Sequence, residues 1–137
     1  MPKNLSGLLV GLSIILFFVC LTLTAFRTSS NNDYPAWFVF VFFGPISLFL
    51  LYPTWLANVF LLLSWTEHSH NLSKCLTYSL VALILALSFL LYKKVPITDT
   101  GSETFSVASG YWVWILSIAL QVLAAAINLT YSSNGTQ

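Results

Sequence analysis

Uncharged, mostly apolar segments alternate with short polar segments along the whole chain. The charged side chains leave four stretches without charge, over residues 5–26, 35–66, 75–92 and 104–131. A helix needs about 20 apolar residues to cross the hydrocarbon core of a bilayer, within a range of roughly 17–25. Residues 5–26, 75–92 and 107–130 each meet this requirement once, so we predict one membrane span in each of these ranges.

The second stretch predicts a further span over about residues 36–65. As one helix at about 1.5 Å per residue, residues 37–65 would measure about 43 Å, too long for one upright crossing and too short for two. Pro45 and Pro53 each remove a backbone hydrogen bond and clash with the preceding turn. We favour a single tilted helix kinked at these prolines. In the alternative, residues 37–51 cross, residues 52–55 lie at the headgroups, and residues 56–65 lie along or dip into the membrane.

Composition supports the membrane assignment. Hydrophobic residues make up 58% of the 137 residues and charged residues 7%, with a mean hydropathy of +0.86. Soluble domains carry about 25% charged residues, so this chain has too few to cover a surface that faces water. A net charge of +1 gives no reason to expect a nucleic-acid partner. We therefore predict one all-α domain over residues 1–137, a polytopic bundle of four transmembrane helices whose second helix is kinked.

The first apolar segment and the positive charges bear on topology. Residues 5–26 exceed the roughly 7–15 residues of a signal-peptide core and end without a small-x-small cleavage site, so we expect an uncleaved span. Four spans place both termini on one side, with Lys3 and Lys74, while Arg27, Lys93 and Lys94 fall on the other. This near balance leaves the positive-inside rule undecided. We assign the side of the termini to the cytoplasm.

Small residues at helical spacing indicate where helices approach closely. Gly7 and Gly11 form a small-xxx-small pair, which lets two backbones come into van der Waals contact in lipid. We expect this pair to pack against another helix of the same chain, with a dimer face as the alternative. Pro45 and Pro53 serve helix packing as well, by setting the bend of the second span.

Polar residues inside the predicted spans indicate contacts within the membrane. Ser117, Gln121 and Asn128 recur, with Ala124, at intervals that place them on one face of the last helix. A polar stripe turns toward the bundle or a cavity, because lipid offers no hydrogen-bond partners. Asn58 falls in the second span and can bond to carbonyls freed by Pro53, or to Gln121 or Asn128.

The ionisable residues argue against chemistry inside the membrane. The predicted spans hold no charged residue or histidine, and proton relays and coupled transporters usually keep one there. The densest ionisable cluster is Glu67, His68 and His70, whose side chains are possible zinc or copper ligands but lack the spacing of a structural site. We interpret the cluster as a polar loop, and we expect no metal, no cofactor and no catalytic residue. Cys20 and Cys75 are expected to be free thiols.

Two short motifs resemble a family. Residues 55–58 read WLAN and are followed by LLLSW at 61–65, and residues 110–117 read GYWVWILS. These look like a pattern found in small uncharacterised bacterial four-span inner-membrane proteins, in which a proline often follows the asparagine. Val59 takes that place here. The resemblance covers the second and last spans and implies a bacterial inner (plasma) membrane protein, without implying an activity.

Together these features predict a small multi-pass protein without a catalytic centre. We expect it to act by lateral contact with another membrane protein, as an accessory subunit or an immunity-type protein, and it could form oligomers. Two other classes stay open. One is an enzyme or carrier that uses Glu67, His68 and His70 at the membrane edge. The other is a small oligomeric channel lined by Ser117, Gln121 and Asn128.

Overall fold

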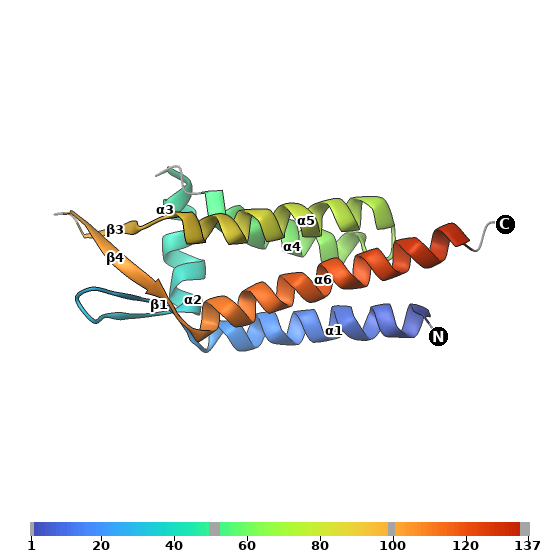
Figure 1. Ribbon diagram of the computed structural model, residues 1–137, viewed down its shortest axis with the longest axis horizontal. Helices are drawn as coiled ribbons and strands as arrows, with labels where there is room; N and C mark the ends of the chain where they lie inside the picture. Colours follow the sequence, from blue (N-terminus) through green and yellow to red (C-terminus); the bar gives the residue numbers. More distant parts are fainter. Residues whose placement is uncertain (1, 50–52, 99–100, 135–137) are drawn as a thin grey trace.

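A bundle of helices capped at one end by a small sheet forms the molecule (Figure 1). The computed structural model describes residues 2–49, 53–98 and 101–134. The chain is mostly helical, and the bundle consists of α1 (Pro2–Leu21), α4 (Leu56–Glu67), α5 (Leu72–Ser88) and α6 (Ser109–Asn134). Within the described residues, three helical segments are long and apolar enough to cross a membrane: Asn4–Leu21, Leu72–Leu91 and Ser109–Ser132. The sequence prediction is confirmed at this level.

The bundle is built from two helix pairs. α1 packs along α6, α4 packs along α5, and α5 joins the pairs by packing on α6. The start of α1 and the last described turn of α6 both lie at the end opposite the sheet, which we call the terminal end (Figure 1). At that end the Asn71 side chain caps α5 by accepting a hydrogen bond from the backbone N–H of Lys74 at 3.0 Å. A 3₁₀ turn, η3 (Phe89–Leu91), extends α5 toward the sheet.

The sheet corrects the all-α prediction. Its antiparallel strands are β1 (Thr24–Thr28), β2 (Asp33–Pro35), β3 (Lys94–Thr98) and β4 (Gly101–Val107), in the order β2-β1-β4-β3. These residues were predicted as helix ends and polar loops. Each hairpin alone is too short to be stable. The bundle brings the two hairpins to the same end, where β1 pairs with β4 and a single sheet results.

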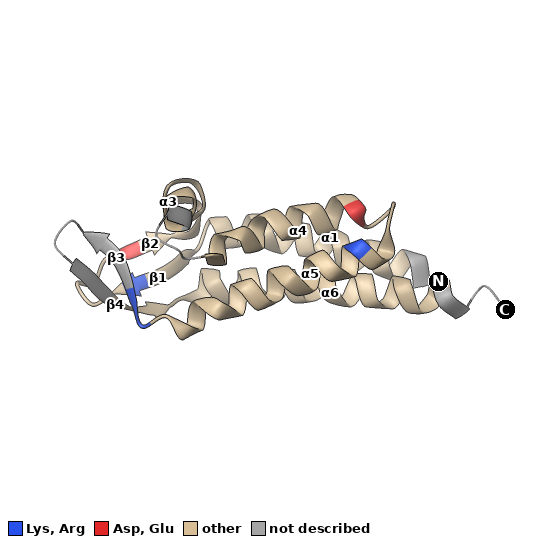
Figure 2. Ribbon diagram, turned by 90° about the horizontal axis from the view of Figure 1, so that it is seen from above, with Lys and Arg blue, Asp and Glu red and all other residues tan. Residues whose placement is uncertain are grey.

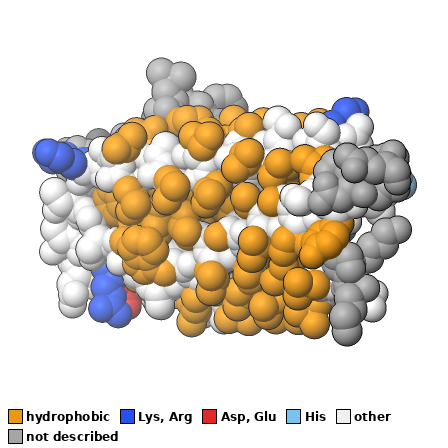
Figure 3. All heavy atoms as spheres, turned by 45° about the vertical axis from the view of Figure 1, so that its right-hand side comes forward, with side chains coloured by type: hydrophobic (Ala, Val, Ile, Leu, Met, Phe, Trp, Pro, Cys, Tyr) orange, Lys and Arg blue, Asp and Glu red, His pale blue; other side chains and the backbone are white. Residues whose placement is uncertain are grey.

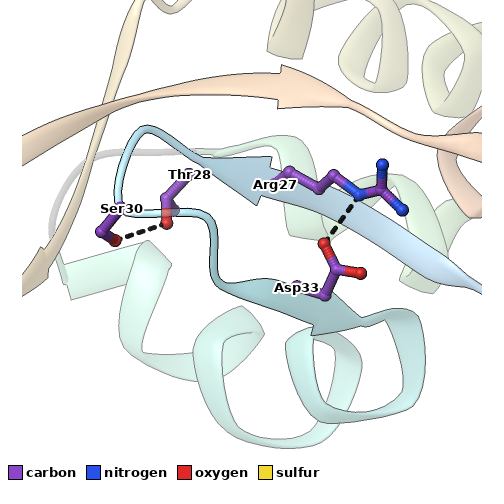
Figure 4. A network of polar contacts seen from close by, with 4 residues as sticks. All are labelled: Arg27, Thr28, Ser30 and Asp33. Carbon is purple, nitrogen blue, oxygen red and sulfur yellow. Dashed lines mark hydrogen bonds and ion pairs between the residues drawn. The ribbon is translucent and has the colours of Figure 1, made fainter.

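The turn between β1 and β2 is held by side chains (Figure 4). Asn31 adopts a left-handed backbone with φ 62°, which asparagine tolerates better than most residues. Arg27 and Asp33 face each other in the register and form an ion pair of 2.7 Å. The hydroxyls of Thr28 and Ser30 are 2.9 Å apart. The short polar segment over residues 27–34, predicted as a loop, is therefore an ordered hairpin.

Residues 36–49 form a segment that lies across the bundle axis, which we call the transverse segment. It consists of α2 (Ala36–Phe38), the π-helical turn η1 (Val39–Phe43) and α3 (Gly44–Phe49). In Figure 1 the segment runs roughly perpendicular to the long helices, and in Figure 2 α3 is seen end-on. Proline cannot donate a backbone hydrogen bond, and an irregular turn before it absorbs the mismatch. Accordingly the N–H of Gly44, one residue before Pro45, bonds to the carbonyl of Val39.

The two predicted kink positions fall in different elements. Pro45 belongs to the transverse segment, whereas Pro53 opens the 3₁₀ turn η2 (Pro53–Trp55) that leads into α4. Residues 50–52, between them, lie outside the described residues. Over residues 36–65 the structure thus describes two elements, the transverse segment and α4, whose axes point in different directions (Figure 1). A continuous kinked span over these residues is not confirmed.

The core between the helices combines small side chains with larger apolar ones. Ala57, Ala82 and Ala86 are fully buried and let α4 and α5 approach closely. Leu61, Ile118 and Phe17 fill the space between these helices and the α1–α6 pair. Ser79, which shares the face of Ala82 and Ala86, is also fully buried.

The outside of the bundle is apolar between two polar ends. Apolar side chains cover much of the face seen in Figure 3, and exposed ones lie on every bundle helix, among them Leu8, Leu62, Ile84 and Leu116. The charged side chains of the described helices and strands lie toward the two ends (Figure 2). Glu67 and Lys74 lie at the terminal end, and Arg27 and Asp33 lie in the sheet. Such a band is what a bilayer requires of a protein surface.

Candidate functional site: a polar network inside the bundle

A network of polar side chains runs through the bundle from its middle to the terminal end. Ser117 and Gln121, predicted to share an inward face of α6, are both fully buried. Asn58 of α4 is also buried, whereas Asn128, farther along α6, is half-exposed. The structure therefore does not bring the four predicted amides and hydroxyls into a single cluster, and each of the three buried residues has its own set of partners.

Ser117 pairs with Ser13 of α1 at the middle of the bundle. The Ser13 hydroxyl donates to the carbonyl of Ser117 at 2.8 Å, and the Ser117 hydroxyl donates to the carbonyl of Ser13 at 2.8 Å. Trp65 of α4 donates from Nε1 to the Ser13 hydroxyl at 3.2 Å. The reciprocal pair fixes the register of α1 against α6, because a slip by one residue would break both bonds.

Gln121 continues the network one turn farther along α6. Its Nε2 donates to the hydroxyl of Ser64 at 2.9 Å and lies 3.5 Å from Sγ of Cys75. Ser64 in turn donates to the carbonyl of Cys75 at 3.0 Å. Among buried side-chain nitrogen and oxygen atoms of the described residues, Oε1 of Gln121 is the one without a hydrogen-bond partner. A buried acceptor left unsatisfied costs roughly 1–3 kcal/mol.

His68 closes the network at the terminal end. Its Nε2 lies 3.0 Å from the hydroxyl of Ser6 on α1, and its Nδ1 lies 3.7 Å from Sγ of Cys75 on α5. Burial disfavours the charged imidazolium and lowers the pKa of His68. In its neutral form the ring has one donor and one acceptor nitrogen.

The predicted cluster of Glu67, His68 and His70 does not form a shared site. His70 is exposed, and His68 turns inward to Ser6 and Cys75. In the part of the chain that the structure describes, no three side chains of His, Cys, Asp or Glu are placed to hold one metal ion. The sequence places Cys75 near this cluster and predicts a free thiol, but it did not predict the contact of that thiol with His68.

Asn58 belongs to a different environment, near the sheet. Its Oδ1 accepts a hydrogen bond from Nε1 of Trp114 at 3.0 Å, whereas the amide of Gln121 lies against Ser64 and Cys75. Nearby, Trp55 donates from Nε1 to the carbonyl of Phe40 at 3.0 Å, so a side chain satisfies part of the irregular backbone before Pro45. The sequence predicted such a partner only for the carbonyls freed by Pro53, and it named Asn58 for that role.

An apolar cavity of about 150 Å³ lies beside Asn58. It is bounded by the transverse segment, η2 and the sheet-side ends of α1 and α6, with Phe17, Phe40, Trp55 and Trp114 in its walls. Trp55 also packs against Gly44, where any side chain would collide with its indole ring. The polar network and this cavity occupy different halves of the bundle.

The predicted packing glycines have no close neighbour among the described residues. A Cβ added at Gly7 or Gly11 would meet no atom within 4 Å. Both glycines lie to one side of the face of α1 that holds the buried residues Ser6, Ser13 and Phe17, and Gly7 is exposed. The described residues therefore give no support to the prediction that these glycines pack against another helix of this chain. Pro45 is exposed on the transverse segment.

Comparison with known proteins identifies no relative, since no family model, no curated protein and no solved structure matches the chain.

Three serines of the network, Ser6, Ser13 and Ser64, were not singled out from the sequence, and Cys75 was named only as a free thiol. Ser6 and Ser13 are seven residues apart, a spacing that keeps them on one face of α1, and this signal was available. Ser64 and Cys75 flank the α4–α5 turn and lack such a periodic signal. Only the antiparallel packing of α4 and α5 brings them together.

Proposed function

We propose that this chain is a small integral membrane protein without a catalytic centre, which acts by lateral contact with another membrane protein. In this proposal α1, α5 and α6 cross the bilayer and α4 is the fourth helix within it. The transverse segment then lies in the interface on the sheet side, where Trp37 and Phe42 on its exposed face are suited to the headgroup level. The proposed location is a bacterial inner membrane, as a multi-pass protein.

The proposal depends on one observation, the open outer face of α1. Small residues at this spacing are useful where a second helix backbone approaches, and Gly7 and Gly11 have no such neighbour among the residues that the structure describes. Glycine in a helix costs about 1 kcal/mol relative to alanine, so two glycines without a close neighbour need a compensating contact. A helix of another membrane protein, crossing α1 at these glycines, provides that contact.

The internal contacts of α6 support this choice over a pore. Ser117 and Gln121 donate their hydrogen bonds to Ser13, Ser64 and Cys75 inside one copy of the chain. A pore lined by these residues would require that network to open. Glu67, His68 and His70 likewise do not form a metal-binding group among the described residues, and His70 is exposed, which gives no support to an edge enzyme or carrier.

A photo-crosslinking experiment tests the proposed contact. A photoreactive residue is placed at Leu8, which is exposed beside the glycines, or at Leu91, which is exposed on the other side of the bundle. We expect irradiation of native membranes to give a defined protein adduct from position 8 and not from position 91. Mass spectrometry of the adduct identifies the partner, including a second copy of this chain.

Substitution of the glycines provides the matched control. The double change Gly7→Leu and Gly11→Leu should abolish the adduct, because the added side chains fill the contact without touching this chain's own core. Thr77→Leu adds similar bulk on the exposed side of α5 and should leave the adduct unchanged. An adduct that survives the glycine substitutions, or lipid adducts alone at position 8, would refute the proposal.

A further inference from the structure

The cavity beside Asn58 is walled mainly by aromatic rings. Its volume of about 150 Å³ is bounded by rings of α1, the transverse segment, η2 and α6, namely Phe17, Phe40, Trp55 and Trp114. An apolar cavity of about this volume takes up one benzene-sized molecule and otherwise stays dry. Aromatic side chains favour offset or edge-to-face contacts with another ring, so these walls suit a planar ring as the ligand.

The wall is unsuitable for a charged ligand. Among the described residues that line the cavity, none is an acid, a lysine or an arginine. A charge on the ligand would therefore be buried without a partner, and burial of an unpaired charge is very costly. This excludes a phosphate headgroup or a free carboxylate inside the cavity, and the ligand must be uncharged.

Most hydrogen-bond donors in the wall are already used within the chain. Nε1 of Trp114 donates to Oδ1 of Asn58 at 3.0 Å. Nε1 of Trp55 and the hydroxyl of Tyr111 donate to backbone carbonyls at 3.0 and 2.9 Å. These three donors are satisfied without a ligand.

The amide nitrogen of Asn58 is the exception. Asn58 lines the cavity although its side chain is only 7% exposed. The donor of Trp114 fixes the orientation of the amide, because Oδ1 is its acceptor atom and Nδ2 then occupies the other side of the group. Within the described residues Nδ2 has no hydrogen-bond partner. A buried amide donor is unfavourable without an acceptor, so this group selects a ligand that carries an oxygen.

The cavity wall reaches the surface of the molecule at the transverse segment. Ile46, which belongs to this wall, is 56% exposed. In the membrane arrangement proposed above, this exposed face meets lipid near the headgroup level. A ring in the cavity can therefore continue as an apolar tail that leaves past Ile46 into the lipid.

We propose that this cavity binds the ring of a membrane-soluble quinone, whose ring carbonyl accepts a hydrogen bond from Nδ2 of Asn58. A quinone combines an uncharged planar ring, carbonyl oxygens and an apolar tail. A hydrocarbon chain supplies no acceptor. The ester carbonyl of a phospholipid is attached to a charged headgroup and two chains, which a benzene-sized cavity does not enclose.

The inference concerns binding and includes no electron transfer. It rests on the membrane location proposed above and is independent of the contact proposed at Gly7 and Gly11. The crosslink expected from position 8 does not require the cavity, so failure of the cavity site and failure of the lateral contact are distinguishable.

Photolabelling in lipid nanodiscs tests the site in the full-length protein. The probe is an azido-substituted benzoquinone with a short alkyl tail, and mass spectrometry locates the adducts. We expect adducts at Phe40 or Trp55 that an excess of the unlabelled quinone displaces. At equal concentration in the membrane, the alkylbenzene of the same shape should displace them about 3–10-fold less effectively, because it lacks one hydrogen bond. Adducts at Ile84, which is 67% exposed on α5, should not be displaced.

Two variants separate the hydrogen bond from the shape of the cavity. Asn58→Leu combined with Trp114→Phe removes the amide together with the donor that pairs with it, so neither partner is left unpaired. In this double variant the quinone and the alkylbenzene should displace the probe equally well. Trp114→Phe alone keeps the amide nitrogen and should keep the preference for the quinone. Displacement by the alkylbenzene also shows that the double variant is folded and keeps its cavity.

Several results would overturn the proposal. They are adducts that spread over lipid-facing positions without displacement, equal displacement by quinone and alkylbenzene in the wild type, a preference for the quinone that persists in the double variant, or equally effective displacement by a fatty-acid methyl ester. The last result would identify a lipid ester as the ligand.

If the double variant does not fold, a filled cavity decides. Cys20 lines the cavity, and its thiol bonds only to the carbonyl of Phe17 in its own helix, at 2.9 Å. Cys20→Leu adds bulk to the wall and should reduce the labelling of Phe40 and Trp55, whereas Val19→Leu, at an exposed position of the same helix, should leave it unchanged. Unchanged labelling in Cys20→Leu would refute the site.

Discussion

The two halves of the bundle are held together by different interactions. From the middle of the bundle to its terminal end, hydroxyl, amide, thiol and imidazole groups bond across helices, as in the reciprocal pair of Ser13 and Ser117. In the half near the sheet, aromatic rings pack edge to face around Phe17 and line a cavity. Hydrogen bonds set the register of helices because they are directional, whereas rings supply contact area and tolerate an irregular backbone. The irregular transverse segment accordingly lies against the aromatic half.

The aromatic half should show the largest effect of a single substitution. Phe17→Ala removes edge-to-face contacts with Phe40 at 5.8 Å and Trp65 at 5.4 Å and leaves a cavity. We expect the free energy of unfolding to fall by about 2–4 kcal/mol. The measurement is denaturation in detergent, followed by tryptophan fluorescence. Phe18→Ala, one position away and 61% exposed, is the control and should change stability little. Equal losses at the two positions would contradict a core role for Phe17.

The polar half should show a smaller effect with strong coupling. Ser13→Ala and Ser117→Ala should each cost about 0.6–1.7 kcal/mol, the range for hydrogen bonds between membrane helices. The double variant should cost less than the sum, because the two hydroxyls also lie 3.4 Å from each other and the first substitution already removes this shared contact. Thr77→Ala, whose hydroxyl bonds within its own helix, is the reference. If the free-energy losses of the two serine substitutions were strictly additive, the two side chains would act independently.

The ion pair outside the bundle should show the smallest effect. Arg27 and Asp33 are each half-exposed, at 58% and 50% of their side-chain surface, and such pairs contribute about 0–1 kcal/mol. Arg27→Ala should therefore lower stability only slightly, and added salt should reduce the difference further. A double-mutant cycle that includes Asp33→Ala measures the coupling free energy between the two side chains. A loss as large as that of Phe17→Ala would mean that the sheet, and not the aromatic rings, stabilises this half.

The sequence predicted the long helices well because their signal is local. Uninterrupted apolar runs end at charged or turn-forming residues, and α1, α5 and α6 follow these runs within a few residues. α1 stops at Leu21, earlier than the predicted residue 26, because Thr24–Thr28 enters the sheet. Pairing of β1 with β4 joins residues from opposite ends of the chain, and no local pattern announces it.

The transverse segment and the site were less predictable for a related reason. An apolar run indicates that a segment contacts lipid or the protein core, but it does not give the direction of the helix axis. Residues 36–49 were therefore predicted to be part of a membrane span over residues 36–65. The stripe of Ser117 and Gln121 on α6 predicted an inward polar face, whereas their partners Ser13, Ser64 and Cys75 depend on helix packing. Gly7 and Gly11 have no close neighbour among the described residues for the same reason, since spacing alone does not say which neighbour a helix face will have.

The pairing of α1 with α6 has a consequence for how the chain is made. Ser13 and Ser117 are separated by 104 positions, so in the proposed membrane arrangement the first helix would enter the bilayer long before its main neighbour has been synthesised. During that interval its buried hydroxyls and its carbonyl at Ser13 must find temporary partners, in water or in the insertion machinery. The strand that follows α1 likewise stays unpaired with β4 until the last loop is complete. Assembly of this small protein is therefore completed only after translation of its final helix.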